Sequence, residues 1–136
     1  MAAFFERTFY LNRTTRQQFD LYEADGATVV QLQATDYVRF AAGRGGNDPS
    51  PILDLVNGAE TAGGSGIDII NTGSASAAAQ IAVIVGENEV IPPGTYDAEF
   101  SVIDDSVASP VDIPTVPVMR GVIHVVDTIG GSTGQP

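Results

Sequence analysis

Short segments in which apolar and polar residues alternate recur along the chain, and turn residues separate them. Around Phe19, Phe40 and Phe100 the alternation has a period of two residues, which is the pattern of a strand with one buried face. The 15 glycines and 8 prolines lie largely between these segments, where turns are expected. The sequence therefore predicts an all-β protein of eight or nine short strands, without a firm helix.

The pairing of neighbouring segments favours hairpins throughout, as in an immunoglobulin-like antiparallel β-sandwich with long loops and extended termini. Residues 1–10 are predicted to form an N-terminal arm or edge strand, residues 11–127 the sandwich, and residues 128–136 a flexible tail. Loops that begin at Gly43 and Asn57 are expected to face partners. The predicted strands span residues 17–23, 28–33, 36–42, 52–56, 67–70, 77–85, 95–104 and 118–127.

The formal net charge is -11, and all six basic residues are arginine. An acidic surface repels phosphate backbones and anionic lipid headgroups, so nucleic acid and membranes are poor partners for this chain. The sequence contains no cysteine, which excludes disulfides and thiolate metal sites. We also find no cationic and hydrophobic segment typical of a secretory signal.

His124 is the single histidine, and it is predicted to share a strand face with Val122 and Val126. A catalytic triad needs a nucleophile and an orienting acid beside the histidine, and a zinc site needs further ligands. The sequence pattern indicates neither, so we interpret His124 as structural and the chain as a protein that is not an enzyme.

Acidic residues gather around Asp104, and calcium prefers several oxygen ligands. Their spacing matches no EF-hand loop, and acidic side chains on a strand are usually solvated. We therefore predict no metal and no other cofactor. A carbohydrate- or calcium-binding adhesion module stays open as an alternative function.

Four positions are expected to have structural roles. Tyr96 follows a Pro-Gly-Thr turn and begins the clearest strand, where a tyrosine corner would bond its hydroxyl to the backbone upstream. Gly26 belongs to an Asp-Gly hairpin turn. Gly94 and Gly121 lie at the openings of the last two strands.

The first ten residues carry four aromatic side chains, which is more than one strand needs. Two interpretations stay open: the aromatics pack in the core, or they anchor the chain to a partner, because aromatic residues dominate interface hot spots. Nearby arginines would then add salt bridges. The predicted partner-binding residues are Phe4, Phe5, Arg7, Phe9, Tyr10, Arg13, Arg16 and Arg44.

Six short motifs follow one another in order: Phe-Asp-Leu at 19–21, Ala-Asp-Gly at 24–26, Asp-Tyr-Val-Arg-Phe at 36–40, Pro-Ile-Leu-Asp-Leu at 51–55, Pro-Gly-Thr-Tyr at 93–96 and Met-Arg-Gly-Val-Ile at 119–123. From about Phe9 to Asp127 this order resembles the immunoglobulin-like domains of tailed-phage virions, such as the N-terminal domain of baseplate upper proteins and related head or tail accessory proteins. A domain of this size with no extension after it resembles a capsid decoration, or cement, protein best.

The resemblance implies a virion structural protein on the outer surface of the capsid, where it would bridge and stabilise neighbouring copies of the major capsid protein. Attachment would use surface burial and β-strand addition at an edge strand or arm, in a homo-oligomeric arrangement. A tail or baseplate adaptor is the alternative within the same assembly.

Overall fold

All regular secondary structure in the described part of the chain is β-strand. The structure is a computed structural model that describes residues 4–11, 13–23, 26–32, 36–43, 51–58, 60–61, 63–89, 91–104 and 115–126. The strands are β1 (Phe4–Tyr10), β2 (Thr15–Asp20), β3 (Asp36–Gly43), β4 (Leu53–Val56), β5 (Gly66–Asn71), β6 (Gln80–Val85), β7 (Gly94–Asp104) and β8 (Thr115–Val126).

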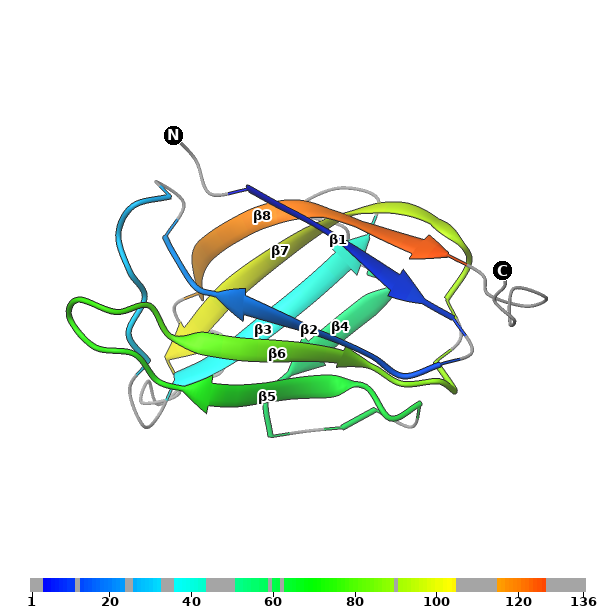
Figure 1. Cartoon of the computed structure of the whole chain (residues 1–136), viewed down its shortest axis with the longest axis horizontal. Coiled ribbons are helices and arrows are strands. Elements are labelled where there is room, and N and C mark those ends of the chain that lie inside the picture. The colour runs from blue at the N-terminus through cyan, green and yellow to red at the C-terminus, as the bar shows by residue number, and fades with distance from the viewer. Residues whose placement is uncertain are drawn as a thin grey trace.

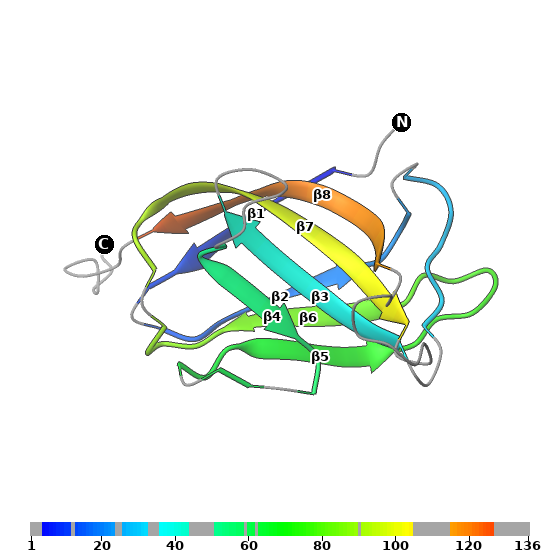
Figure 2. The same cartoon turned by 180° about the vertical axis from the view of Figure 1, so that it is seen from behind.

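The strands form two sheets that pack face to face (Figure 1). One sheet has five strands in the order β1-β8-β7-β3-β4, and the other has three in the order β2-β6-β5. Seen from behind, the five-stranded sheet lies in front, and its edge strand β4 runs beside β5 (Figure 2). Neighbouring strands are antiparallel, except that β1 is parallel to β8.

The strand order is that of an immunoglobulin-like sandwich. Strands β8, β7, β3 and β4 take the places of the G, F, C and C′ strands, and β2, β6 and β5 take those of B, E and D. The prediction of an all-β, immunoglobulin-like sandwich is confirmed. Two expectations about the pairing are wrong. Strand β1 is parallel to β8, and hairpins do not run throughout, because only β3 with β4, β5 with β6 and β7 with β8 pair as neighbours in sequence.

The predicted strand at 28–33 is wrong over its described part. It makes a single bridge between Tyr22 and Val29 instead of a hairpin. Val30 donates its amide to Leu21 O at 3.0 Å and accepts from the Ala79 amide at 2.8 Å. The segment therefore bonds to two parts of the chain in turn, and no regular ladder forms, although Val30 itself is buried.

Four phenylalanine rings form the centre of the core. Phe5, Phe40 and Phe100 come from the five-stranded sheet, and Phe19 comes from the facing sheet. All six distances between their ring centroids lie between 4.8 and 6.4 Å. Aromatic pairs at such spacings add to the stabilisation that burial gives, so this cluster ties the two sheets together.

The N-terminal segment is an edge strand of the domain. Phe5 and Phe9 point into the core, with 6% and 1% of their surface exposed. A Cβ at Gly121 would lie 2.1 Å from the carbonyl oxygen of Phe5, so the close approach of β1 to β8 requires glycine at this position. The expectation that Phe5 and Phe9 contact a partner does not fit these positions, because the folded domain already covers both side chains.

Tyr96 lies at the start of β7, buried, and its hydroxyl donates to the carbonyl oxygen of Pro92 at 2.6 Å. A bond from this position to backbone four residues upstream is the geometry of a tyrosine corner. Gly94, the first residue of the strand, has a φ of 156° and lies against the Tyr96 ring. Gly26 has a φ of 76°, which suits the turn between Tyr22 and Val29.

Candidate functional site

The outward side chains of β1 and β8 form the surface that we call the β1 face. Over Phe4–Tyr10 of β1 and the paired stretch 120–126 of β8, the odd-numbered positions point into the core, so the even-numbered positions point to solvent. The parallel register places them in four neighbouring pairs: Phe4 with Arg120, Glu6 with Val122, Thr8 with His124, and Tyr10 with Val126.

Apolar side chains are exposed at both ends of the β1 face. Phe4 has 67% of its surface exposed at one end, and Tyr10 and Val126 have 39% and 42% at the other. The guanidinium of Arg13 lies 5.6 Å from the centre of the Tyr10 ring, in reach of a cation–π contact. Among the large hydrophobic side chains of the described residues, Phe4 has the largest exposed fraction, so this residue is the strongest candidate for a contact with another molecule.

His124 connects three strands at the middle of the β1 face. Its Nε2 lies 2.5 Å from Glu6 Oε2 on β1, and its Nδ1 shares a hydrogen bond of 3.0 Å with Thr95 Oγ1 on β7. Sequence reasoning found neither neighbour, because only the strand register brings Glu6 and Thr95, which are 118 and 29 positions away in the sequence, next to His124. A hydroxyl, an imidazole and a carboxylate in a row also occur in catalytic triads.

Catalysis by such a row needs more than the three side chains. A triad works beside donors that stabilise an oxyanion, in a site from which water is excluded. Here Thr95 is exposed, and the Glu6 side chain has 62% of its surface in solvent. We interpret the row as a polar link that fastens β1 to β8 and β7.

Two ion pairs lie farther along the outer surface of the same sheet. Arg120 Nε on β8 donates to Glu99 Oε2 on β7 at 3.1 Å. Arg39 on β3 donates two hydrogen bonds to Asp54 on β4, from Nε to Oδ1 at 2.7 Å and from Nη2 to Oδ2 at 2.8 Å. The hydrogen bond with Asp54 raises the pKa of Arg39, so the guanidinium stays charged. Both pairs join neighbouring strands, β7 with β8 and β3 with β4.

The free edge of β1 is closed by side chains over part of its length. Gln17 Nε2 donates to the carbonyl oxygen of Thr8 at 3.1 Å, and Thr15 Oγ1 bonds with both the amide and the carbonyl of Tyr10. Edge strands that are covered in this way are poor templates for another strand. Strand addition, which the sequence suggested for an edge strand or arm, is thus disfavoured at Thr8 and Tyr10 of this edge.

The structure separates the arginines that the sequence grouped as partner-binding. Arg7 packs over the Phe19 ring at 4.7 Å, partly buried between the sheets. Arg13 is exposed beside Tyr10, whereas Arg16 lies on the other sheet, 3.7 Å from Asp68. Arg44 lies outside the described residues.

Sequence reasoning missed a buried polar cluster between two loops. Ser65 is fully buried, and its hydroxyl donates to Glu89 Oε1 at 2.6 Å and accepts from the Gly86 amide at 2.9 Å. Thr61 donates to the same Glu89 oxygen at 2.7 Å. These bonds fix the loop before β5 to the turn after β6. No spacing in the sequence marks them, because each partner lies in an irregular segment.

Of the acidic residues that gather around Asp104, the structure describes the side chains of Asp97 and Glu99, whereas Asp105 and Asp112 lie outside the described residues. Over the described ranges there is no group of three or more His, Cys, Asp or Glu side chains that could hold an ion. Asp97 and Glu99 lie on the outer surface, and Glu99 is paired with Arg120. The same ranges hold no helix that could span a membrane.

Comparison with known proteins adds little to this picture. No family model matches the sequence, and no curated protein matches it. Among solved structures, the chain is similar to the natural killer cell receptor NKp44, described as a triggering partner in natural cytotoxicity, with 10% identity and a TM-score of 0.36. That match covers 92% of this chain and 98% of the receptor chain. A likeness at this level carries no argument about function.

Proposed function

We propose that this chain is a structural protein that attaches to a larger assembly through the β1 face. In line with the phage-like order of its motifs, the assembly is the head of a tailed phage, and the chain is a capsid decoration protein. It binds the major capsid protein on the outer surface of the shell and stabilises the shell by bridging its subunits.

The observation that carries this proposal is the exposure of Phe4 at one end of the β1 face and of Tyr10 and Val126 at the other. His124 on β8 bonds with Glu6 on β1 and Thr95 on β7, which joins the three strands, so a partner would meet a preformed surface. A rigid surface loses little conformational entropy on binding. Repetition over a symmetric shell then makes modest individual contacts effective.

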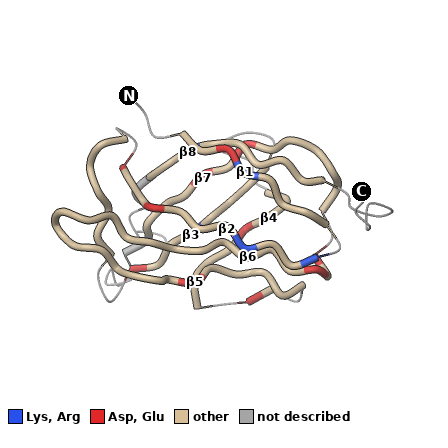
Figure 3. Tube along the Cα trace, in the orientation of Figure 1, with Lys and Arg blue, Asp and Glu red and all other residues tan. Residues whose placement is uncertain are grey.

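Charge supports a place outside the shell. The chain carries -11 net charges, and Figure 3 shows acidic positions spread over both sheets. Packaged DNA would repel such a surface, whereas the outer side of a shell does not present a phosphate backbone. The eight residues of the β1 face include one carboxylate, Glu6, and one guanidinium, Arg120, so this face carries no net formal charge.

A binding assay with particles that lack this protein tests the proposal. Purified protein is added back, and bound copies are counted by sedimentation and quantitative gel densitometry. The double variant Phe4→Ser with Tyr10→Ser removes two aromatic contacts and should weaken binding about thirtyfold or more, the effect of losing one strong hot spot. The control Ile70→Ser changes a residue on the three-stranded sheet that is about as exposed as Tyr10, and it should bind like the unaltered protein.

The copy number at saturation separates the two virion locations. A decoration protein should reach about a hundred copies or more, as repetition over the shell requires. Saturation near six or twelve copies would instead support the tail or baseplate adaptor. Full binding by the double variant, with an unchanged melting temperature, would contradict attachment through the β1 face.

A further inference from the structure

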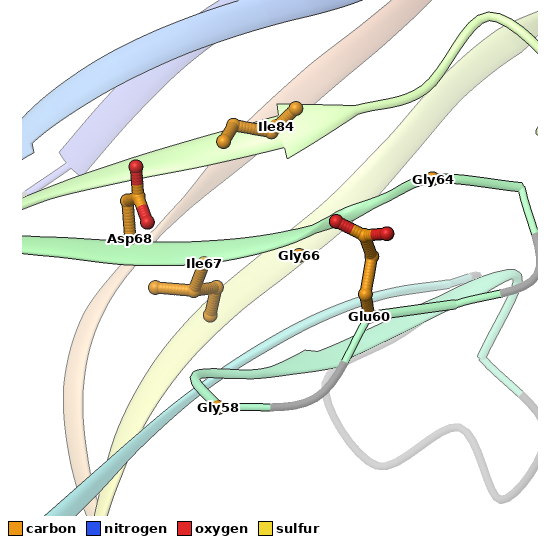
Figure 4. A pocket seen from close by; sticks show the side chains of 7 residues that line it. All are labelled: Gly58, Glu60, Gly64, Gly66, Ile67, Asp68 and Ile84. Atoms are coloured by element: carbon orange, nitrogen blue, oxygen red, sulfur yellow. The ribbon is translucent and has the colours of Figure 1, made fainter.

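The connection between β1 and β2 differs in composition from every later one between the described strands. Residues 11–14 read Leu-Asn-Arg-Thr, without glycine or proline, whereas each later connection contains at least one of the two. The connection from β4 to β5, for example, has positive φ angles of 86° at Gly58 and 87° at Gly64 (Figure 4). Glycine and proline are the strongest turn formers, and the β-branched Thr14 favours extended backbone. The connection 11–14 is therefore the one that can most readily become extended.

The contacts of β1 are made with parts of the chain that are distant in sequence. In the sheet it pairs with β8 alone, while β2 belongs to the other sheet. Phe5 and Phe9 are buried in the core, and the Phe5 ring lies 5.4 Å from that of Phe100. Glu6 bonds with His124 on β8. Every copy of the chain presents the same β8 and the same core, so the β1 strand of a second copy would make identical contacts.

The side chains that β2 contributes to the edge of β1 fit either origin of the strand. Gln17 donates to the carbonyl oxygen of Thr8, and Thr15 bonds with the backbone of Tyr10. These bonds need β2 beside the incoming strand, but they do not need the two strands to belong to one chain. A second copy offers the same Gln17 and Thr15 to a strand that it receives.

A change in the connection would disturb little of the fold. Leu11 continues the pairing of β1 by donating its amide to Val126 O at 2.9 Å, so it belongs with β1. Arg13 and Thr14 are exposed, and Asn12 lies outside the described residues. Extending the backbone at Arg13 and Thr14 therefore uncovers no core side chain.

We propose that two copies of this chain exchange β1, so that β1 of each copy lies on β8 of the other. The exchange is reciprocal and symmetric, as in other domain-swapped dimers. Phe5 and Phe9 of one copy then complete the core of its neighbour. The β1 face stays whole, because the same two strands lie side by side, but it is now built from two chains. This exchange does not rest on attachment to a particle.

Concentration decides between the closed chain and the exchanged pair. A short connection holds β1 near its own β8 at an effective concentration of about 1 mM, so the closed chain prevails in dilute solution. Exchange also requires Phe5 and Phe9 to leave the core. Unfolding in urea followed by refolding at about 1 mM should therefore produce dimers, and refolding at about 10 μM should produce monomers.

Disulfide trapping shows whose β1 lies on β8. The sequence contains no cysteine, and Glu6 and Val122 are register partners in the pairing of β1 with β8. The single variants Glu6→Cys and Val122→Cys are mixed in equal amounts, refolded at high concentration and oxidised. Neighbouring strands lie within the distance that a disulfide spans, so exchange should give cross-linked pairs that nearly all contain one copy of each variant.

Random collision gives a different distribution, in which half of the cross-linked pairs are mixed. The control mixture of Ile70→Cys with Val122→Cys should give this distribution, because Ile70 is exposed on the other sheet. A dimer that packs two β1 faces together would also cross-link each variant with itself. A mixed share near one half, or no cross-linked pairs, would overturn the proposal.

Two further variants guard the result against a fold damaged at Glu6. The double variant Glu6→Cys with Val122→Cys, refolded in dilute solution, should close the disulfide within one chain, which confirms the register. Insertion of two glycines between Arg13 and Thr14 favours a turn and should lower the dimer fraction about fivefold or more, measured by size exclusion with light scattering. An unchanged dimer fraction would also refute exchange through this connection.

Discussion

Replacing Phe5 with alanine tests whether the N-terminal segment belongs to the fold. The Phe5 ring is 6% exposed and contacts the rings of Phe19 at 5.2 Å and Phe100 at 5.4 Å. Loss of a buried phenylalanine removes about 1.5–3 kcal/mol of transfer free energy. Each close aromatic pair is worth about 0.5–1.5 kcal/mol more.

We therefore expect Phe5→Ala to lower the free energy of unfolding by about 4 kcal/mol, within the usual range for Phe→Ala in a core. For a domain of this size that corresponds to a fall in melting temperature of about 14 °C. Urea denaturation followed by circular dichroism gives the free energy, and a thermal scan gives the melting temperature.

The neighbouring residue provides the control. Phe4 is the same residue type one position earlier, but 67% of its surface is exposed. Phe4→Ala should change stability by no more than about 0.5 kcal/mol. Equal and small effects of the two substitutions would mean that the segment is a free arm, and the assignment of β1 to the core would be wrong.

Three further substitutions probe single contacts. Tyr96→Phe removes the bond to Pro92 and should cost about 1 kcal/mol in urea denaturation; no change would refute the tyrosine corner. Gly121→Ala places a Cβ against the Phe5 carbonyl and should cost about 1–3 kcal/mol, with faster hydrogen exchange in β1; unaltered exchange would contradict the close approach. Ser65→Ala should cost about 2 kcal/mol by thermal melting, because it breaks a bond to a carboxylate and leaves a buried amide unpaired; a neutral result would remove the loop cluster from the account.

The sandwich could be predicted because its strongest strands alternate with one buried face. Phe40 and Phe100 stand directly opposite each other in the register of β3 and β7, and both point into the core, as the period of two requires. The tyrosine corner could also be predicted, since a Pro-Gly-Thr turn directly precedes Tyr96. Such features depend on neighbours in the sequence, which local patterns describe well.

The role of β1 could not be read in the same way. Aromatic residues occupy both of its faces, with Phe4 and Tyr10 outside and Phe5 and Phe9 inside, so alternation does not show which face is buried. Its partner β8 lies more than a hundred residues later and runs parallel to it. Only the tertiary pairing decides that Phe5 is core while Phe4 is free to contact a partner.

The predicted partner-binding residues lie on different surfaces of the domain for the same reason. Arginines that are close in sequence lie on different surfaces, Arg13 beside Tyr10 and Arg16 across the sandwich. Likewise, Gly66 and Ile84 lie side by side only because of the register of β5 with β6. Long-range register fixes these sites, and no local motif reports it.

Electron cryomicroscopy of purified particles that carry this protein tests its attachment most directly. We expect density for the domain in many copies on the outside of the head, with the β1 face turned toward the shell and Phe4 and Tyr10 at the contact. Density confined to a sixfold or twelvefold ring at the tail would contradict the decoration role. Density on the head with the β1 face turned to solvent would contradict attachment through this surface.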